Sequence, residues 1–155
     1  MAIYNFDIFT MNSDGSDVRQ MTRDPEYDAE PMWSPDGKRI FFISGREGNF
    51  AVFSMDENGG QLVNLSTNSS ISEGPVGFSG DGTRIILFGS TPDHPSIGQL
   101  WITDLEGHGR RQISSFKEKI YRIDFSPDKK RYAFSGKREG NFEIYVSDAM
   151  NLPES

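Results

Sequence analysis

Apolar and polar positions alternate over short stretches of this chain, and Gly, Pro, Asp and Asn separate the stretches. The clearest unit has four apolar or alternating segments, at residues 31–34, 39–44, 50–56 and 61–66. Segment 39–44 (RIFFIS) is β-branched and aromatic, and Asn58-Gly59 before the last segment suits a tight hairpin. This pattern predicts four short antiparallel strands, with Gly and Pro recurring too often for a helix.

A similar sequence segment occurs three times: PMWSPDGKRIFF from Pro31, PVGFSGDGTRIILF from Pro75 and YRIDFSPDKKRYAF from Tyr121. Anchored on Ser34, Ser79 and Ser126, the later copies follow at intervals of 45 and 47 residues. A period of this length indicates a repeat architecture, in which no single repeat buries its own apolar face. Four short antiparallel strands per repeat are typical of a β-propeller blade.

Over the whole chain, the pattern predicts an all-β fold of antiparallel four-stranded propeller blades, about three per chain. We expect the last two strands of a blade at 1–22, whole blades at 29–66 and 74–114, and three strands of a blade at 121–150. Closed propellers have roughly four to eight blades, so one chain leaves the ring incomplete. Either two copies form a homodimer with a six-bladed ring, or the chain is part of a longer propeller. In a dimer, the third strands at 6–12 and 142–148 would compete for one place.

Composition narrows the possible partners. The net charge of −7 disfavours nucleic acid, because neutralising phosphates requires clustered Lys and Arg. No apolar run approaches the roughly 20 residues of a membrane span, and the opening MAIYNFDIF lacks the features of a signal peptide. Cysteine is absent, and His94 and His108 do not have metal-ligand spacing. We therefore expect no cofactor and no metal.

The phrase WSPDGKRIFF, followed by SGREGNFAVFSMDENGG and QLVNLS, resembles the repeat of TolB-like β-propellers. The opening IFTMNSDGSDVRQMT resembles the end of another such repeat, so the resemblance covers almost the whole chain. It implies a non-catalytic scaffold that binds a protein partner, because most propellers of this family are binding platforms. It also implies a periplasmic location if a signal has been removed, and a cytoplasmic one otherwise. Related propellers leave an alternative open: a module of an enzyme, either the gating domain of a serine peptidase or a saccharide lyase or hydrolase.

The three repeated Ser–Asp turns invite a catalytic interpretation, but we expect a structural one. Asp36, Asp81 and Asp128 each follow a Ser by two residues between the first and second strands. A short carboxylate at this place is suited to capping the backbone of its own turn. No nucleophile, base and metal ligand converge elsewhere, and we expect no catalytic residue.

Candidate partner-binding residues lie in the connections between strands two and three and between successive blades. In a propeller these connections emerge on one face, and Tyr and Arg are common anchors of protein interfaces. The expected contact residues are Tyr27, Asp28, Glu30, Arg46, Glu47, Glu73, His94, Tyr121, Arg122, Arg138 and Glu139. The alternative is a set of turns with solvated charges. His94 is expected in an extended loop at 90–98.

Overall fold

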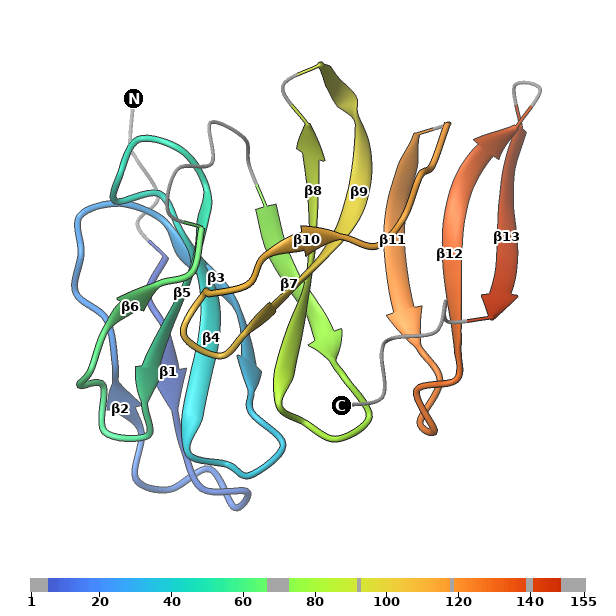
Figure 1. Cartoon of the computed structure of the whole chain (residues 1–155). Helices are drawn as coiled ribbons and strands as arrows, with labels where there is room; N and C mark the ends of the chain where they lie inside the picture. The colour runs from blue at the N-terminus through green and yellow to red at the C-terminus, as the bar shows by residue number, and fades with distance from the viewer. Residues whose placement is uncertain (1–5, 67–72, 92, 118, 139–140, 149–155) are drawn as a thin grey trace. The chain divides into compact units, whose positions relative to one another are not determined.

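The computed structural model describes residues 6–66, 73–91, 93–117, 119–138 and 141–148, and within them every regular element is a β-strand (Figure 1). None of these residues forms a helix of the length and apolarity that a bilayer crossing needs. The chain divides into two compact units, residues 1–75 and 76–155, and each is described by itself.

Unit 1 contains a two-stranded and a four-stranded antiparallel sheet. The first pairs β1 (Phe9–Thr10) with β2 (Arg19–Gln20). The second has the order β3 (Asp28–Trp33), β4 (Arg39–Ser44), β5 (Ala51–Asp56) and β6 (Val63–Asn64). Neighbours in sequence are neighbours in the sheet, as hairpin-forming turns require.

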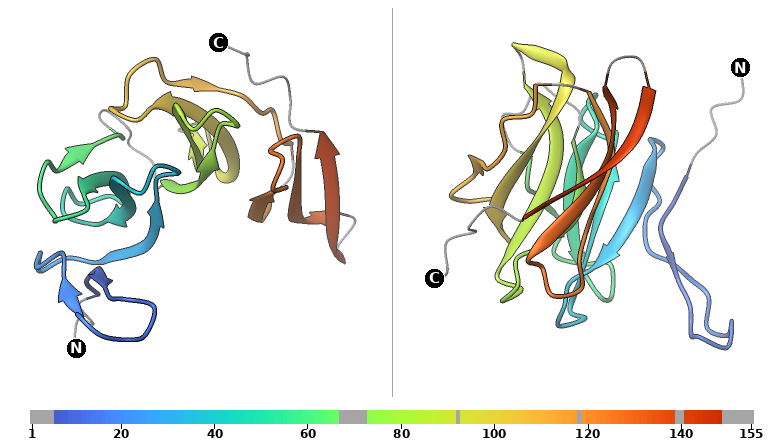
Figure 2. Two further views of the ribbon diagram at one scale, coloured as in Figure 1. Left: turned by 90° about the horizontal axis from the view of Figure 1, so that it is seen from below. Right: turned by 90° about the vertical axis from the view of Figure 1, so that its right-hand side faces the viewer.

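Unit 2 contains a four-stranded and a three-stranded antiparallel sheet. The order of the first is β7 (Glu73–Phe78), which begins at the end of unit 1, then β8 (Arg84–Thr91), β9 (His94–Asp104) and β10 (Arg111–Gln112). The second has the order β11 (Ile120–Phe125), β12 (Arg131–Arg138) and β13 (Asn141–Asp148), with β13 drawn in red in Figures 1 and 2. The predicted fold class, antiparallel four-stranded sheets of a partial propeller, is confirmed.

The expected loop at 90–98 is wrong. Strand β8 extends to Thr91 and β9 begins at His94, and these two residues pair. A register shift between Ser90 and Thr91 accommodates the longer hairpin. Gly98 lies under the ring of Phe88, where an added Cβ would be 2.1 Å from Cζ. The described residues of 90–98 therefore belong to the strands of an irregular hairpin and not to a loop.

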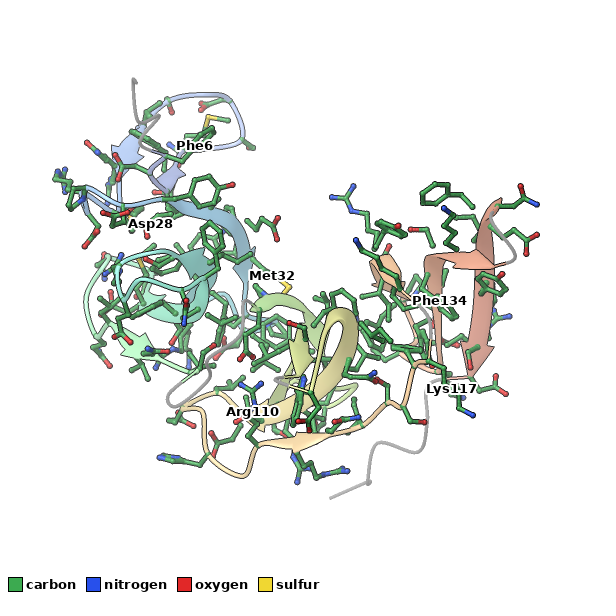
Figure 3. The ribbon with its side chains drawn as sticks, turned by 90° about the horizontal axis from the view of Figure 1, so that it is seen from above. Phe6, Asp28, Met32, Arg110, Lys117 and Phe134 are labelled. Carbon is green, nitrogen blue, oxygen red and sulfur yellow. The ribbon has the colours of Figure 1, made fainter. Side chains whose placement is uncertain are left out.

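Each unit has an apolar core between its two sheets. In unit 1, Ile8 and Met21 of the two-stranded sheet pack on Ile40, Phe42, Ala51, Phe53 and Met55. In unit 2, Ile86, Leu100 and Ile102 pack with Ile123, Phe125 and Tyr132, and Phe134 packs against the same cluster (Figure 3). In each unit, the face that the first sheet turns toward this core is called its downstream face, and the face that the second sheet turns toward the core is called its upstream face. The opposite side of each sheet takes the other name.

Candidate functional site

The repeated Ser–Asp turns have one geometry. The Ser34 hydroxyl donates to Asp36 Oδ1 at 2.7 Å and accepts the Arg39 amide at 2.9 Å. Asp36 Oδ1 also accepts the Lys38 amide at 3.2 Å. The same contacts recur at Ser79 with Asp81 and at Ser126 with Asp128. The predicted capping role is confirmed, since each hydroxyl and carboxylate binds its own turn.

These hydrogen bonds also set the acidity of the turn carboxyls. The Ser79 hydroxyl, followed by the Thr83 amide, lowers the pKa of Asp81 to about 2. The pKa values of Asp36 and Asp128 are lowered in the same way, first by the Ser hydroxyl and then by a backbone amide. All three side chains are acceptors that stay ionised at neutral pH, which suits a cap and not a general acid.

Arg46 and Asp28, two predicted contact residues, form a buried ion pair. Arg46 Nη2 lies 3.1 and 3.0 Å from the two carboxylate oxygens of Asp28, and its Nε donates to Ser44 Oγ at 2.7 Å. The Asp28 side chain is 0% exposed and that of Arg46 is 17% exposed. The guanidinium also lies 4.9 Å from the centroid of the Phe53 ring. This pair fixes the start of β3 against the β4–β5 turn.

The other predicted residues of unit 1 differ in exposure. Glu30 is exposed, with a left-handed φ of 53° at a register shift in β3. Glu47 is exposed and accepts from Asn64 Nδ2 at 2.7 Å. Glu73 is buried, and its amide donates to the Phe50 carbonyl at 3.1 Å. The carboxylates of Glu30 and Glu47 are therefore the accessible acids of this set.

In unit 2, Tyr121 and Arg122 are exposed at the start of β11, and Lys119 Nζ lies 5.1 Å from the Tyr121 ring centroid. His94 and Arg138 begin and end strands, paired with Thr91 and Asn141. Glu139 lies outside the described residues. Among the predicted contact residues of unit 2, Tyr121 and Arg122 are thus the two whose side chains the structure describes, and both are exposed to solvent.

An aromatic pair borders the equivalent hairpin in both units. The Tyr27 ring lies 5.1 Å from Phe6 and 5.5 Å from Phe50, and the Tyr121 ring lies 5.1 Å from Phe142. Phe6, Phe50, Tyr121 and Phe142 are all exposed. Sequence reasoning named both tyrosines and missed the phenylalanines. The signal was present, because Phe50 and Phe142 end the repeated phrases SGREGNF and SGKREGNF.

Other polar groups give no reaction centre within the described part of the chain. No three His, Cys, Asp or Glu side chains there are placed to hold a metal. A hollow of about 310 Å³ in unit 2 is lined by Arg84, Thr103, Asp104, His108 and Arg111, among others. His108 Nδ1 lies 3.4 Å from Asp104 Oδ2, and the His108 side chain is largely in solvent. This hollow offers charged side chains and lacks a positioned nucleophile.

Three antiparallel sheets of three or four strands, each with a Ser–Asp turn between its first two strands, are typical of β-propeller blades. The family model of the TolB beta propeller domain matches residues 4–100. The chain belongs to this family.

Known relatives are longer than this chain. It is 28% identical over 145 residues to the Protein TolB homolog of Chlorobium luteolum, covering 92% of this chain and 31% of the relative. TolB of Acinetobacter baumannii superposes with a TM-score of 0.73 and 23% identity, over 92% of this chain and 35% of that one. Oligogalacturonate lyase of Vibrio parahaemolyticus superposes with a TM-score of 0.64 and 17% identity, over 94% and 42%. At these identities the structural matches show the fold alone.

Proposed function

We propose that this chain is a non-catalytic TolB-like propeller scaffold that binds a protein partner. The observation that supports it is the Tyr–Phe pair beside the equivalent hairpin of each unit, in which Phe50, Tyr121 and Phe142 are exposed and Tyr27 is half-buried. Aromatic side chains contribute a large contact area at low entropic cost and are frequent hot spots of protein interfaces. A Tyr–Phe pair beside a hairpin suits a protein surface better than a small ligand.

The charged residues beside these pairs divide into two roles. Arg46 serves as a positioning residue, because its guanidinium is held by Asp28 and Ser44. Glu30 and Glu47 in unit 1, and Arg122 in unit 2, are exposed and remain available to a partner. A polar rim around an aromatic centre is the usual composition of a protein interface.

The test is capture of a partner from an extract of the source cells by the immobilised chain, quantified by mass spectrometry. Two site variants are compared with wild type: Tyr27→Ser with Phe50→Ser, and Tyr121→Ser with Arg122→Ser. Leu62→Ser is the matched control, since Leu62 is an exposed apolar residue that belongs to neither pair. Arg46 is left unchanged because its loss would disturb the fold.

We expect at least one protein to be retained by wild type and the control, and reduced by about tenfold or more by a site variant, the loss typical of a hot spot. Equal retention by all four chains would remove the aromatic pairs from the function. Circular dichroism of each variant separates loss of binding from loss of fold.

An enzyme module is the second candidate, supported by the likeness in fold to oligogalacturonate lyase. Its test is direct: the purified chain is incubated with oligogalacturonate and with a chromogenic peptide, and product is followed by absorbance. Turnover of either substrate would favour the enzyme module. A periplasmic location and a six-bladed homodimeric ring remain predictions.

A further inference from the structure

One position of the third strand differs in exposure between repeats. Ile8, Leu100 and Ile144 are equivalent, each four residues before the residue that starts the next turn, namely Asn12, Asp104 and Asp148. Ile8 is 3% exposed and Leu100 is 2% exposed, because each packs in the core between two sheets of its unit. Ile144 is 73% exposed. The downstream face of the β11–β13 sheet is therefore uncovered where its equivalents are buried.

The same comparison applies to the upstream face. In β5, Phe53 and Met55 are buried in the core that contains Ile8 and Met21. Their equivalents in the first sheet are Phe9 and Met11, which are 55% and 67% exposed. The upstream face of the β1–β2 sheet is therefore uncovered as well.

The two uncovered faces carry the residue types of the core in unit 1. There, an aliphatic residue from a downstream face, Ile8, packs with Phe53 and Met55 of an upstream face. The exposed faces present Ile144 and Val146 on one side and Phe9, Met11 and Val18 on the other. Apolar side chains exposed together on one face mark an interaction site more often than a solvated surface. The chain thus exposes both halves of a contact that it also makes internally.

We propose that the downstream face of the β11–β13 sheet binds the upstream face of the β1–β2 sheet of a second copy of this chain. The contact is head-to-tail, because the two faces are different surfaces. A pair joined by one such contact keeps one face of each kind free, and further contacts of the same kind either close a ring or extend a filament. The variants that test this contact change none of Tyr27, Phe50, Tyr121 and Arg122, so failure of this proposal and failure of the partner-binding function can be distinguished.

Two complementary variants test the polarity of the contact. The downstream variant carries Ile144→Asp and Val146→Asp, and the upstream variant carries Phe9→Asp and Met11→Asp. All four side chains are exposed, so the substitutions leave the cores of both units intact. Leu62→Asp, an exposed apolar residue on neither face, is the control. Native mass spectrometry and light scattering give the masses.

We expect wild type and the Leu62→Asp control to assemble, and each variant alone to have the monomer mass of 17.4 kDa. An equimolar mixture of the two variants has one intact pair of faces, so it should give a one-to-one dimer and nothing larger. A variant that assembles alone would show that one face binds itself and would overturn the proposal. A monomeric wild type at every concentration, or a mixture without dimers, would also overturn it and assign the faces to another occupant, such as further sheets of a longer chain.

Discussion

The amide of Val52 donates to the hydroxyl of Ser66 at 2.9 Å, across fourteen residues of chain. Ile8 with Thr22 and Leu100 with Ser114 make the same bond at the same separation, at 2.9 and 2.8 Å. All three lie in buried surroundings beside a backbone bond from the fourth strand to the third. The fourth strands β2, β6 and β10 are only two residues long. The hydroxyl that follows each of them adds one more hydrogen bond to the third strand of the same sheet.

Ser114→Ala should destabilise unit 2 by about 1–3 kcal/mol, because it leaves a buried amide without an acceptor. It also removes the donor to Gln99 Oε1, which lies 2.8 Å from the hydroxyl. The free energy of unfolding in urea measures the loss. Ser115→Ala is the matched control, since Ser115 is the exposed neighbour and should change stability by less than about 0.5 kcal/mol. Equal effects of the two variants would contradict the role of the hydroxyl.

Arg46→Met should destabilise unit 1 by about 3–5 kcal/mol, because it leaves the Asp28 carboxylate buried without its cation. The double variant Asp28→Asn with Arg46→Met should recover most of that loss, since no buried charge remains. Thermal or urea unfolding of the two single variants and the double variant gives the coupling energy. A double variant as unstable as the sum of the single ones would show that the pair is not coupled.

The pH dependence of stability should contain a contribution from Asp81. The Ser79 hydroxyl and the Thr83 amide lower its pKa in the folded chain to about 2, below the usual value for an aspartate of about 3.9. A lowered folded-state pKa gives stability that is present above the unfolded pKa and is lost as the pH falls toward the folded one. Between about pH 4 and pH 2, Asp81→Asn should therefore flatten the fall in stability. The chemical shift of the Asp81 carboxyl carbon, followed by NMR, should titrate near pH 2; a midpoint near 4 would contradict the hydrogen-bonded turn.

Gly98→Ala should destabilise the β8–β9 hairpin by about 1–3 kcal/mol, the usual cost of overpacking. The added Cβ would meet Phe88 Cζ, Cε2 and Cε1 at 2.1, 2.6 and 2.7 Å. In a Phe88→Leu background the same substitution should cost less, because the ring is gone. Unfolding of the four chains in a double-mutant cycle measures the coupling, and additive effects would show that the ring does not cause the loss.

Features that depend on residues close together in the chain could be predicted from the sequence. The strands, the hairpins and the capping role of Asp36, Asp81 and Asp128 follow from short patterns and turn residues. The pairing of Arg46 with Asp28 could not be predicted in this way, because it spans 18 residues and a register shift in β3. The extension of β8 and β9 into residues 90–98 could not be predicted either, because Pro and Gly in this segment are typical of a loop and the hairpin has an irregular register.

The predicted contact residues show the same limit. Tyr27 and Tyr121 were expected at a surface from their residue type. The contacts that pair each tyrosine with a phenylalanine cross between strands and appear only in three dimensions. Aligning the SGREGNF and SGKREGNF phrases would have named Phe50 and Phe142 in advance.

The central claim is that the two exposed faces of this chain, on the β11–β13 sheet and on the β1–β2 sheet, bind each other between copies of the chain. Light scattering of the wild-type chain over a range of concentrations tests it most directly. The account predicts a mass that rises from 17.4 kDa to at least twice that value as the concentration increases. A mass of 17.4 kDa at every concentration would contradict it.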